Sequence, residues 1–341
     1  MDKTFYILDS PTMPTGYNHM FFVEKVARGF EYNGFKVKVA SRISEIIEPG
    51  FVMLCDHPFY YSFGSRHNKT GNTLRMIPGM IERLDKRLRF VARMSKALRY
   101  RALKDLARQI KGKDIVVIAW GANPERFILD ELNIPVIFTC NYYYGEPEAR
   151  NQLVWYKFYS DRKNENAMPI RHSADVDPEM IGKDCSNKKY LVSYIGDKSY
   201  GSEYRALFAG RPDCKIIGTP PYIPEEARKY IYKNSMFVLG LSSPQNKLDK
   251  IVTERVFEAL AFGAICITDN IYAVKATDGC AILAKDAKEL DNIVNTLRND
   301  TAKREAIRQN GFELIRKSGT FASRATEFIE LAQKLYSVKF A

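Results

Sequence analysis

One stretch of 21 residues decides the fold of this chain: Lys250-Ile-Val-Thr-Glu-Arg-Val-Phe-Glu-Ala-Leu-Ala-Phe-Gly-Ala-Ile-Cys-Ile-Thr-Asp-Asn270. Thr253 can cap a short helix, and Gly263 can end that helix in a left-handed conformation. Residues 264–268 then have the continuous apolar character of a buried parallel strand. We therefore expect a helix followed at once by a strand, the repeating step of an α/β fold.

Two charged residues of the expected helix share one of its faces. Arg255 and Glu258 are three positions apart, so a cation and a carboxylate stand together near a helix N-terminus. A forked guanidinium and helix N–H groups suit a diphosphate, and a carboxylate suits ribose hydroxyls. The pattern indicates a nucleotide diphosphate-sugar. The alternative is a surface ion pair, which is the usual role of this spacing.

Several segments, in order, resemble a known family. Residues 257–263 look like the donor-binding motif of GT-B glycosyltransferases of the group 1 type, and residues 190–205 resemble the strand and glycine loop that open their donor domain. Residues 214–218 are similar to the next strand, and residues 311–324 to the closing helical stretch. The likeness covers roughly residues 168–330. It implies an α/β, GT-B fold with two Rossmann-like domains facing across a cleft.

The chain departs from that family at one position. Many retaining members carry a second Glu eight residues before the ribose Glu, and here that position is Lys250. The resemblance implies that Glu258 holds the nucleotide ribose and that the chain transfers a sugar to a hydroxyl acceptor. It leaves the stereochemistry, inverting or retaining, open.

A donor site follows from the resemblance and from the negative charge of a leaving diphosphate. Arg255 and the helix start at Thr253 are assigned to the diphosphate, and the loop after Gly218 to the base; Arg205 could equally pack as a helix-face residue. The expected donor-binding residues are Gly196, Lys198, Arg205, Thr219, Tyr222, Lys250, Thr253, Arg255 and Glu258. We expect a UDP- or GDP-sugar as co-substrate, with no cofactor and no metal.

An inverting enzyme also needs a general base. His19 is the first candidate because it lies between the first strand and the first helix, similar to where plant-type inverting GT-B enzymes place their catalytic His. Asp56 and His57, just past the third strand, are the other candidates. The alternative for His19 is a helix cap or a surface residue, the more common role of a lone His.

Aromatic residues near the middle of the chain suggest an acceptor surface. Three successive Tyr beside Gly and Pro cannot all point inward from a strand, so some can stack on a sugar or a base. Plain packing is the alternative. The expected acceptor-binding residues are Gly16, Tyr17, Tyr142, Tyr143 and Tyr144.

Strand and helix patterns alternate in both halves of the chain. Strands are expected at 4–8, 35–40, 51–55, 114–120, 134–139, 191–195, 215–217, 236–241 and 264–268. Helices are expected at 17–33, 124–132, 225–234, 253–263, 287–299, 301–317 and 321–336. One more is expected after the loop at 196–201, and it runs through Phe208. We expect an acceptor-binding domain at 1–166, a donor-binding domain at 167–320 and, at 321–341, a helix that in the resembled family crosses back to the N-terminal domain.

The composition of the 341 residues is that of a soluble globular protein, with 45% hydrophobic and 27% charged residues. No apolar run is long enough to cross a bilayer, and the start lacks the order of a signal peptide. The six scattered cysteines show neither C-x-x-C pairs nor zinc-finger spacing, so we expect reduced thiols. These features predict a cytoplasmic protein, with peripheral binding at the inner membrane face left open.

The net charge of +12 is concentrated in one region. Between Arg83 and Lys113 stand twelve Lys or Arg and two Asp, with apolar residues at three- and four-residue steps. The pattern predicts basic amphipathic helices. Their basic face suits an anionic membrane surface, an acidic acceptor or DNA, and a solvated face is the alternative.

Three main functions remain open from the sequence, and an epimerase on the same two-domain fold is a smaller possibility. The first is a glycosyltransferase that builds a polysaccharide, another glycan or a glycoconjugate. The second is a glycosyltransferase acting on modified DNA bases, because residues 190–205 and 253–259 also resemble, more loosely, phage DNA β-glucosyltransferase. That enzyme's catalytic acid would align near Cys140 or Asn141, where no carboxylate stands. The third is a binding protein for sugar nucleotides or nucleic acid that lacks catalysis.

Overall fold

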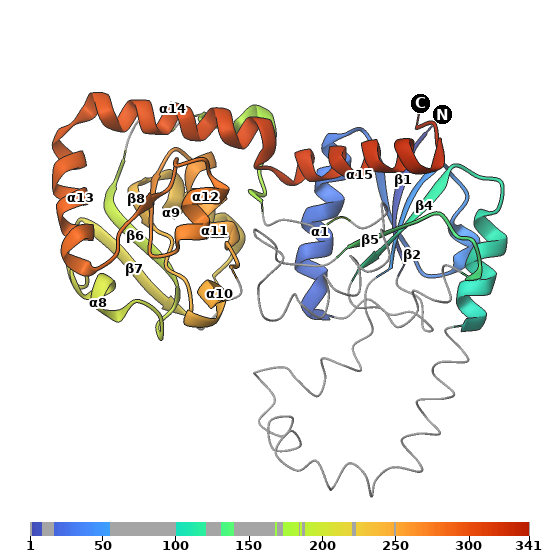
Figure 1. The fold of residues 1–341 in the computed structure, drawn as a ribbon, viewed down its shortest axis with the longest axis horizontal. Helices are drawn as coiled ribbons and strands as arrows, with labels where there is room; N and C mark the ends of the chain where they lie inside the picture. Colours follow the sequence, from blue (N-terminus) through green and yellow to red (C-terminus); the bar gives the residue numbers. More distant parts are fainter. Residues whose placement is uncertain are drawn as a thin grey trace, which may run out of the picture. The chain divides into compact units, whose positions relative to one another are not determined.

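The computed structural model describes residues 2–8, 17–54, 100–120, 131–139, 168, 173–183, 185, 188–219, 223–248 and 250–340. For residues 17–22, 120, 138 and 219 only the backbone is described. The described residues form two compact units (Figure 1). Unit 1 takes its described residues from 1–140, 165–169 and 325–341, and unit 2 takes its described residues from 170–324.

The sheet of unit 1 has five parallel strands in the order β2-β1-β3-β4-β5. The strands are β1 (Thr4–Leu8), β2 (Lys36–Ala40), β3 (Gly50–Leu54), β4 (Ile115–Trp120) and β5 (Val136–Thr139). Helix α1 (Tyr17–Tyr32) packs on this sheet through Phe30, whose ring stacks on that of Phe5 with 4.3 Å between centroids. All five predicted strands of the first half are therefore confirmed, and the expected helix at 124–132 lies largely outside the described residues.

The last helix, α15 (Phe321–Tyr336), begins in unit 2 and from Ala325 onward belongs to unit 1. The Tyr336 hydroxyl donates a hydrogen bond of 2.6 Å to the carbonyl of Val136 and accepts one of 3.1 Å from its N–H. Phe328 is fully buried, with its ring 6.4 Å from that of Phe30. The terminal helix is thus part of the core of unit 1.

The sheet of unit 2 is also parallel and has the order β10-β9-β8-β6-β7. Its strands are β6 (Tyr190–Asp197), β7 (Cys214–Thr219), β8 (Ser235–Leu239), β9 (Ile265–Thr268) and β10 (Ile282–Leu283). If the strands of each unit are numbered along the chain, the two sheets have the same strand order. Each unit is therefore a doubly wound α/β sheet, as predicted.

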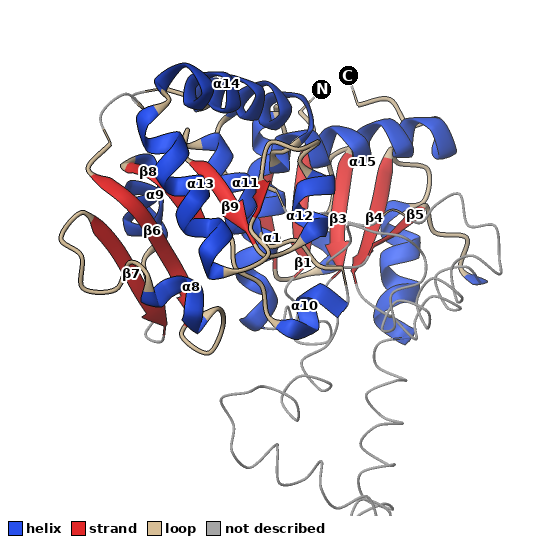
Figure 2. Cartoon of the chain, turned by 60° about the vertical axis from the view of Figure 1, so that its left-hand side comes forward, coloured by secondary structure: helices blue, strands red, loops and turns tan. Residues whose placement is uncertain are grey.

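Helices cover both faces of this second sheet (Figure 2). The strand side chains alternate between two cores: Phe237 and Leu239 enter one, and Val238 enters the other. Helices α8 (Ser202–Ala206) and α13 (Ala287–Asn299) supply the first core. Helices α9 (Glu225–Lys233), α11 (Glu254–Ala261) and α14 (Thr301–Ser318) supply the second.

The helix and strand that the decisive stretch predicts are α11 and β9. Gly263 has φ +68°, and the N–H groups of Gly263 and Ala264 bond to the carbonyls of Leu260 and Ala259 at 3.1 and 2.9 Å. This is a Schellman motif, in which the left-handed glycine ends the helix. Besides two single-turn 3-10 helices, three short elements were not predicted: α10 (Pro244–Leu248), α12 (Ile271–Ala276) and β10.

Residues 100–110 are the described part of the predicted basic helices. Ala102, Leu103, Leu106 and Ile110 are buried, which confirms the amphipathic pattern for this part. The exposed cations Arg101, Lys104 and Arg108 lie on the other side, and exposed Lys111 follows the end of the helix. None of the described helices is long and apolar enough to cross a membrane. The four cysteines with described side chains, at 185, 214, 266 and 280, are free thiols.

Candidate functional site

The strand order of unit 2 defines where a ligand is expected. From β6 the chain crosses to β7 on one side, and from β8 it crosses to β9 on the other. The carboxyl ends of β6 and β8 therefore flank a topological switch point, where parallel α/β sheets bind their ligands. Gly196 lies at the end of β6, and Leu241 lies just past β8.

Arg255, in the first turn of α11, reaches this switch point. Its Nη1 donates a hydrogen bond of 3.1 Å to the carbonyl of Leu241, and its Cζ lies 5.2 Å from the ring centroid of Tyr194. A Cβ at position 196 would stand 2.7 Å from Arg255 Nη2 and 2.6 Å from the Tyr194 hydroxyl. Only glycine therefore leaves room for the guanidinium at the end of β6.

The loop after β6 is held by its own side chains. Asp197 Oδ1 accepts hydrogen bonds from the N–H and the hydroxyl of Ser199, at 2.8 and 2.7 Å, as in an Asx turn. The Tyr194 hydroxyl donates to the carbonyl of Asp197 at 2.8 Å. Gly201 has φ +56°, and a Cβ there would lie 2.5 Å from Leu241 Cδ1. The loop is thus fixed against the end of β8.

Two predicted donor residues, Lys198 in this loop and Arg205 in the helix that follows it, differ in their surroundings. Arg205 donates to the carbonyls of Tyr200 (2.9 Å) and Lys198, and its Cζ lies 5.6 Å from the Tyr194 ring centroid. Arg205 therefore holds the loop, and its role in donor binding stays a prediction. Lys198 is exposed, and its Cβ would lie 2.9 Å from a Cβ added at Gly218.

Thr253 occupies the N-cap position of α11 with an extended backbone, as predicted. Its side chain makes no capping hydrogen bond, so that part of the prediction is wrong. The N–H of Val256, which a capping hydroxyl would bind, instead donates to the Thr253 carbonyl at 3.1 Å. The Thr253 hydroxyl oxygen is buried and has no hydrogen-bond partner within the described part of the chain.

Glu258 is the buried carboxylate of the site, with 1% of its surface exposed. Its Oε1 accepts a hydrogen bond of 2.7 Å from Arg228 Nη2, across from helix α9. Burial works against the charge of Arg228, but Glu258 and neighbouring carboxylates outweigh it, so the pKa of Arg228 is raised. Sequence reasoning missed Arg228 and proposed Arg255 as the neighbouring cation.

Tyr232 connects the two basic residues of the site. Its side chain is fully buried, and burial raises the pKa of its hydroxyl. The charges of Arg255 and Arg228 lower that pKa, whereas the charge of Glu258 raises it further. The charges of Arg255 and Glu258 thus both affect the pKa of one buried hydroxyl, although the ion-pair partner of Glu258 is Arg228.

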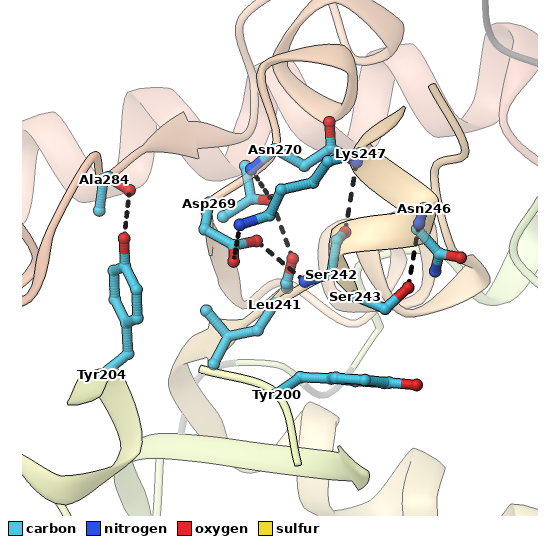
Figure 3. A network of polar contacts seen from close by, with 12 residues as sticks. Tyr200, Tyr204, Leu241, Ser242, Ser243, Asn246, Lys247, Asp269, Asn270 and Ala284 are labelled. Atoms are coloured by element: carbon cyan, nitrogen blue, oxygen red, sulfur yellow. Dashed lines mark hydrogen bonds and ion pairs between the residues drawn. The ribbon is translucent and has the colours of Figure 1, made fainter. Parts of the chain in front are cut away.

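A second polar network lies at the ends of β8 and β9 (Figure 3). Asp269, directly after β9, accepts a hydrogen bond of 2.9 Å from the N–H of Ser242 and pairs with Lys247 at 2.6 Å. Asn270 donates to the Ser242 hydroxyl at 3.2 Å and to the carbonyl of Ile251 at 2.9 Å. These residues carried a weak signal in the sequence, since two polar residues directly follow a buried apolar run.

Lys250, where the resembled family often has a carboxylate, has φ +56°. Its Nζ lies 5.5 Å from the ring centroid of Tyr272. A cation therefore stands near the start of α11, where the resembled family often has a carboxylate.

Many of the remaining predicted residues lie outside what the structure describes. The side chains of His19, Tyr17 and Thr219 and the whole residues Gly16, Asp56, His57, Tyr142, Tyr143, Tyr144 and Tyr222 are in this group. Their roles stay predictions. Among the described residues, no group of three or more His, Cys, Asp or Glu could hold a metal ion.

Residues 197–330 match the model of a family described as glycosyl transferase-like. A glycosyl transferase-like domain occupies this part of the chain. The match begins at the last residue of β6 and includes the loop, Arg228, α11 and β9. The predicted enzyme class, a glycosyltransferase, is confirmed by this match. No curated protein matches the chain in sequence.

Solved structures confirm the fold. An α-glucosyltransferase in complex with UDP and a 13-mer DNA containing a HMU base is similar with a TM-score of 0.58 and 9% identity, over 98% of this chain and 100% of that chain. A UDP-forming α,α-trehalose-phosphate synthase from Burkholderia xenovorans has a TM-score of 0.52 and 9% identity, over 98% and 99%. The predicted two-sheet GT-B fold is therefore confirmed.

The DNA-modifying β-glucosyltransferase, solved with and without UDP-glucose, is also similar. It has a TM-score of 0.47 and 10% identity, over 97% of this chain and 100% of that chain. A likeness at this level supports no argument about function.

Proposed function

We propose that this glycosyltransferase moves a sugar from a nucleotide diphosphate-sugar to a hydroxyl acceptor and binds the donor at the carboxyl ends of β6 and β8. One observation carries the proposal: the Arg255 guanidinium lies over the end of β6, with the buried carboxylate of Glu258 one helical turn further along α11. Arg255 would bind the diphosphate and Glu258 the ribose hydroxyls.

The surroundings of Arg255 suit a leaving diphosphate. The N-terminal end of α11 lies beside the Thr253 hydroxyl, which has no partner within the described part of the chain, and Lys198 and Lys250 add positive charge. Stabilisation of the developing phosphate charge by such groups is a main source of catalysis in transfer reactions of this type. We propose that these groups carry the charge of the leaving diphosphate and that no metal is required.

The donor base and the catalytic base are further parts of the proposal. We favour UDP over GDP, because two structures with this fold are described as UDP-bound and UDP-forming. His19, Asp56 and His57 remain the proposed general bases, and the stereochemistry remains open because Lys250 replaces a carboxylate. Donor binding is proposed for residues 167–320, acceptor binding for residues 1–166 and a cytoplasmic location for the chain.

For the acceptor we propose a glycan or glycoconjugate hydroxyl. A modified DNA base is the second candidate, favoured by the exposed cations at 101, 104 and 108 on one side of a helix and at 111 just past its end. Their spacing suits successive phosphates of a polyanion. A solved structure with this fold contains DNA, which agrees with this second candidate.

A thermal-shift screen tests the donor site. UDP, GDP, ADP, CMP and dTDP, with their sugars, are added to wild type, Arg255→Met and Glu258→Ala. We expect one nucleotide family to raise the melting temperature of wild type and neither variant to respond. Stabilisation that persists in both variants would contradict the site.

A transfer assay then separates the functions. The stabilising donor is incubated with a panel of glycans, lipid-linked sugars and duplex DNA containing hydroxymethylated bases. Transfer to a glycan supports the leading proposal, and transfer to DNA alone supports the second candidate. Donor binding without transfer or donor hydrolysis would indicate a binding protein and contradict the proposed enzyme activity.

A further inference from the structure

The ion pair between Arg228 and Glu258 has no assigned role in donor binding. It joins helix α9 to helix α11, and 22% of the Arg228 side chain but only 2% of the Glu258 side chain is exposed. The separation of 2.7 Å is that of a short, charge-assisted hydrogen bond. A carboxylate this deeply buried stays ionised only when a cation or several hydrogen-bond donors compensate its charge.

The neighbouring groups of α9 and α11 differ from Arg228 in charge or in hydrogen-bond partner. From α9, Tyr232 adds a hydroxyl that is itself buried. From α11, Glu254 adds a like charge, whereas the Arg255 guanidinium is bonded to the carbonyl of Leu241. Helix α14 meets α11 through Gly311 and Phe312, and β9 contributes Cys266, whose thiol has a pKa raised by burial to about 12. Phe312 and Cys266 belong to the same core as Phe257 and Leu260 of α11.

The two helices are also fixed to each other at their C-terminal ends. Lys188 Nζ donates hydrogen bonds to the carbonyl of Lys233 at 2.9 Å, at the end of α9, and to that of Phe262 at 3.3 Å, at the end of α11. A cation at helix C-termini stabilises both dipoles. The relative position of Arg228 and Glu258 is thus set from outside the pair.

We propose that Arg228 is a positioning residue that keeps Glu258 ionised and oriented, so that the donor site selects ribonucleotides over 2′-deoxyribonucleotides. This inference rests on the proposed role of Glu258 in ribose binding. An ionised carboxylate with a fixed plane accepts hydrogen bonds from ribose hydroxyls, whereas a protonated or turned one accepts fewer. Loss of one such bond removes the preference for the hydroxyl-bearing sugar.

The test measures the dissociation constants of UDP, GDP and their 2′-deoxy forms by calorimetry from pH 5.5 to 8.5. Wild type is compared with Arg228→Met, Arg228→Lys and the control Lys229→Met. Lys229 lies on the same helix and pairs with Glu225 at 2.6 Å, so its loss removes a cation from α9 without touching Glu258. The ratio of deoxy to ribo dissociation constants cancels the titration of the diphosphate, which both nucleotides share.

We expect a ratio of at least tenfold in wild type and in Lys229→Met, unchanged with pH. In Arg228→Met the ratio should fall toward one at low pH and recover partly at high pH, because the buried carboxylate takes up a proton more readily without the charge of Arg228. Arg228→Lys keeps the charge but not the forked geometry, so its ratio should be reduced at every pH. This variant carries the test if Arg228→Met does not fold.

The outcomes separate the two claims. A wild type that binds neither nucleotide would overturn the proposed donor site itself. A wild type that prefers ribonucleotides, with Arg228→Met and Arg228→Lys showing the same ratio and the same pH profile, would overturn the positioning role alone. An equal fall in Lys229→Met would also overturn it, because the effect would then come from helix α9 in general.

Discussion

At the scale of single residues, the site depends on a glycine. Gly196 ends β6 where the Tyr194 hydroxyl and the Arg255 guanidinium both approach, and there is no space for a methyl group between them. The glycine loop was predicted from its resemblance to a family, and the structure supplies the steric reason for one of its glycines.

Gly196→Ala should weaken nucleotide binding more than it weakens folding. The new Cβ would displace the flexible end of Arg255, so we expect at least a tenfold increase in the dissociation constant of the donor nucleotide and a small fall in melting temperature. Gly210→Ala is the control. Gly210 has φ +78° and no atom within 4 Å of an added Cβ, so this change strains the backbone away from the site. Wild-type affinity in Gly196→Ala would contradict the geometry at β6.

The sequence revealed one side of the buried ion pair but not the other. Glu258 stands in a recognisable motif, whereas Arg228 is 30 residues away on a helix whose pattern shows only that it is amphipathic. The packing of α9 against α11 brings them together, and no local rule predicts such a contact. The same is true of the Lys247–Asp269 pair.

At the scale of elements, helix ends show what local signals can predict. Asp286 and Asp300 cap α13 and α14, accepting hydrogen bonds of 2.8 and 2.9 Å from the N–H groups of Glu289 and Lys303. These two helices begin and end within one residue of the predicted bounds. The unpredicted elements β10, α10 and α12 have two, five and six residues, too few for a periodic pattern to repeat.

The cap residues should differ in their contributions to stability. Asp300→Ala removes a capping bond and should lower the free energy of unfolding by about 1 kcal/mol. Thr253→Ala should change it by less than about 0.5 kcal/mol, because the Thr253 hydroxyl makes no such bond. Urea unfolding followed by circular dichroism measures both. Equal losses in the two variants would show that Thr253 caps α11 in solution.

At the scale of the whole molecule, both units repeat one strand order. The alternation of buried strands and amphipathic helices in the sequence predicted two doubly wound sheets, because parallel strands need crossover helices. The position of the ligand edge in unit 2 follows from that order. The side chains of the proposed catalytic bases and of the aromatic acceptor residues lie outside what the structure describes, so their roles stay predictions.

Hydrogen exchange of the wild-type chain, with and without the nucleotide that stabilises it, tests the central claim most directly. Ligand contacts slow the exchange of the amides they cover or order. We predict slower exchange in residues 196–201, 241–243 and 253–258, at the ends of β6 and β8 and the start of α11. Slower exchange confined to unit 1, or unchanged exchange in these three segments at saturating nucleotide, would contradict the donor site described for unit 2.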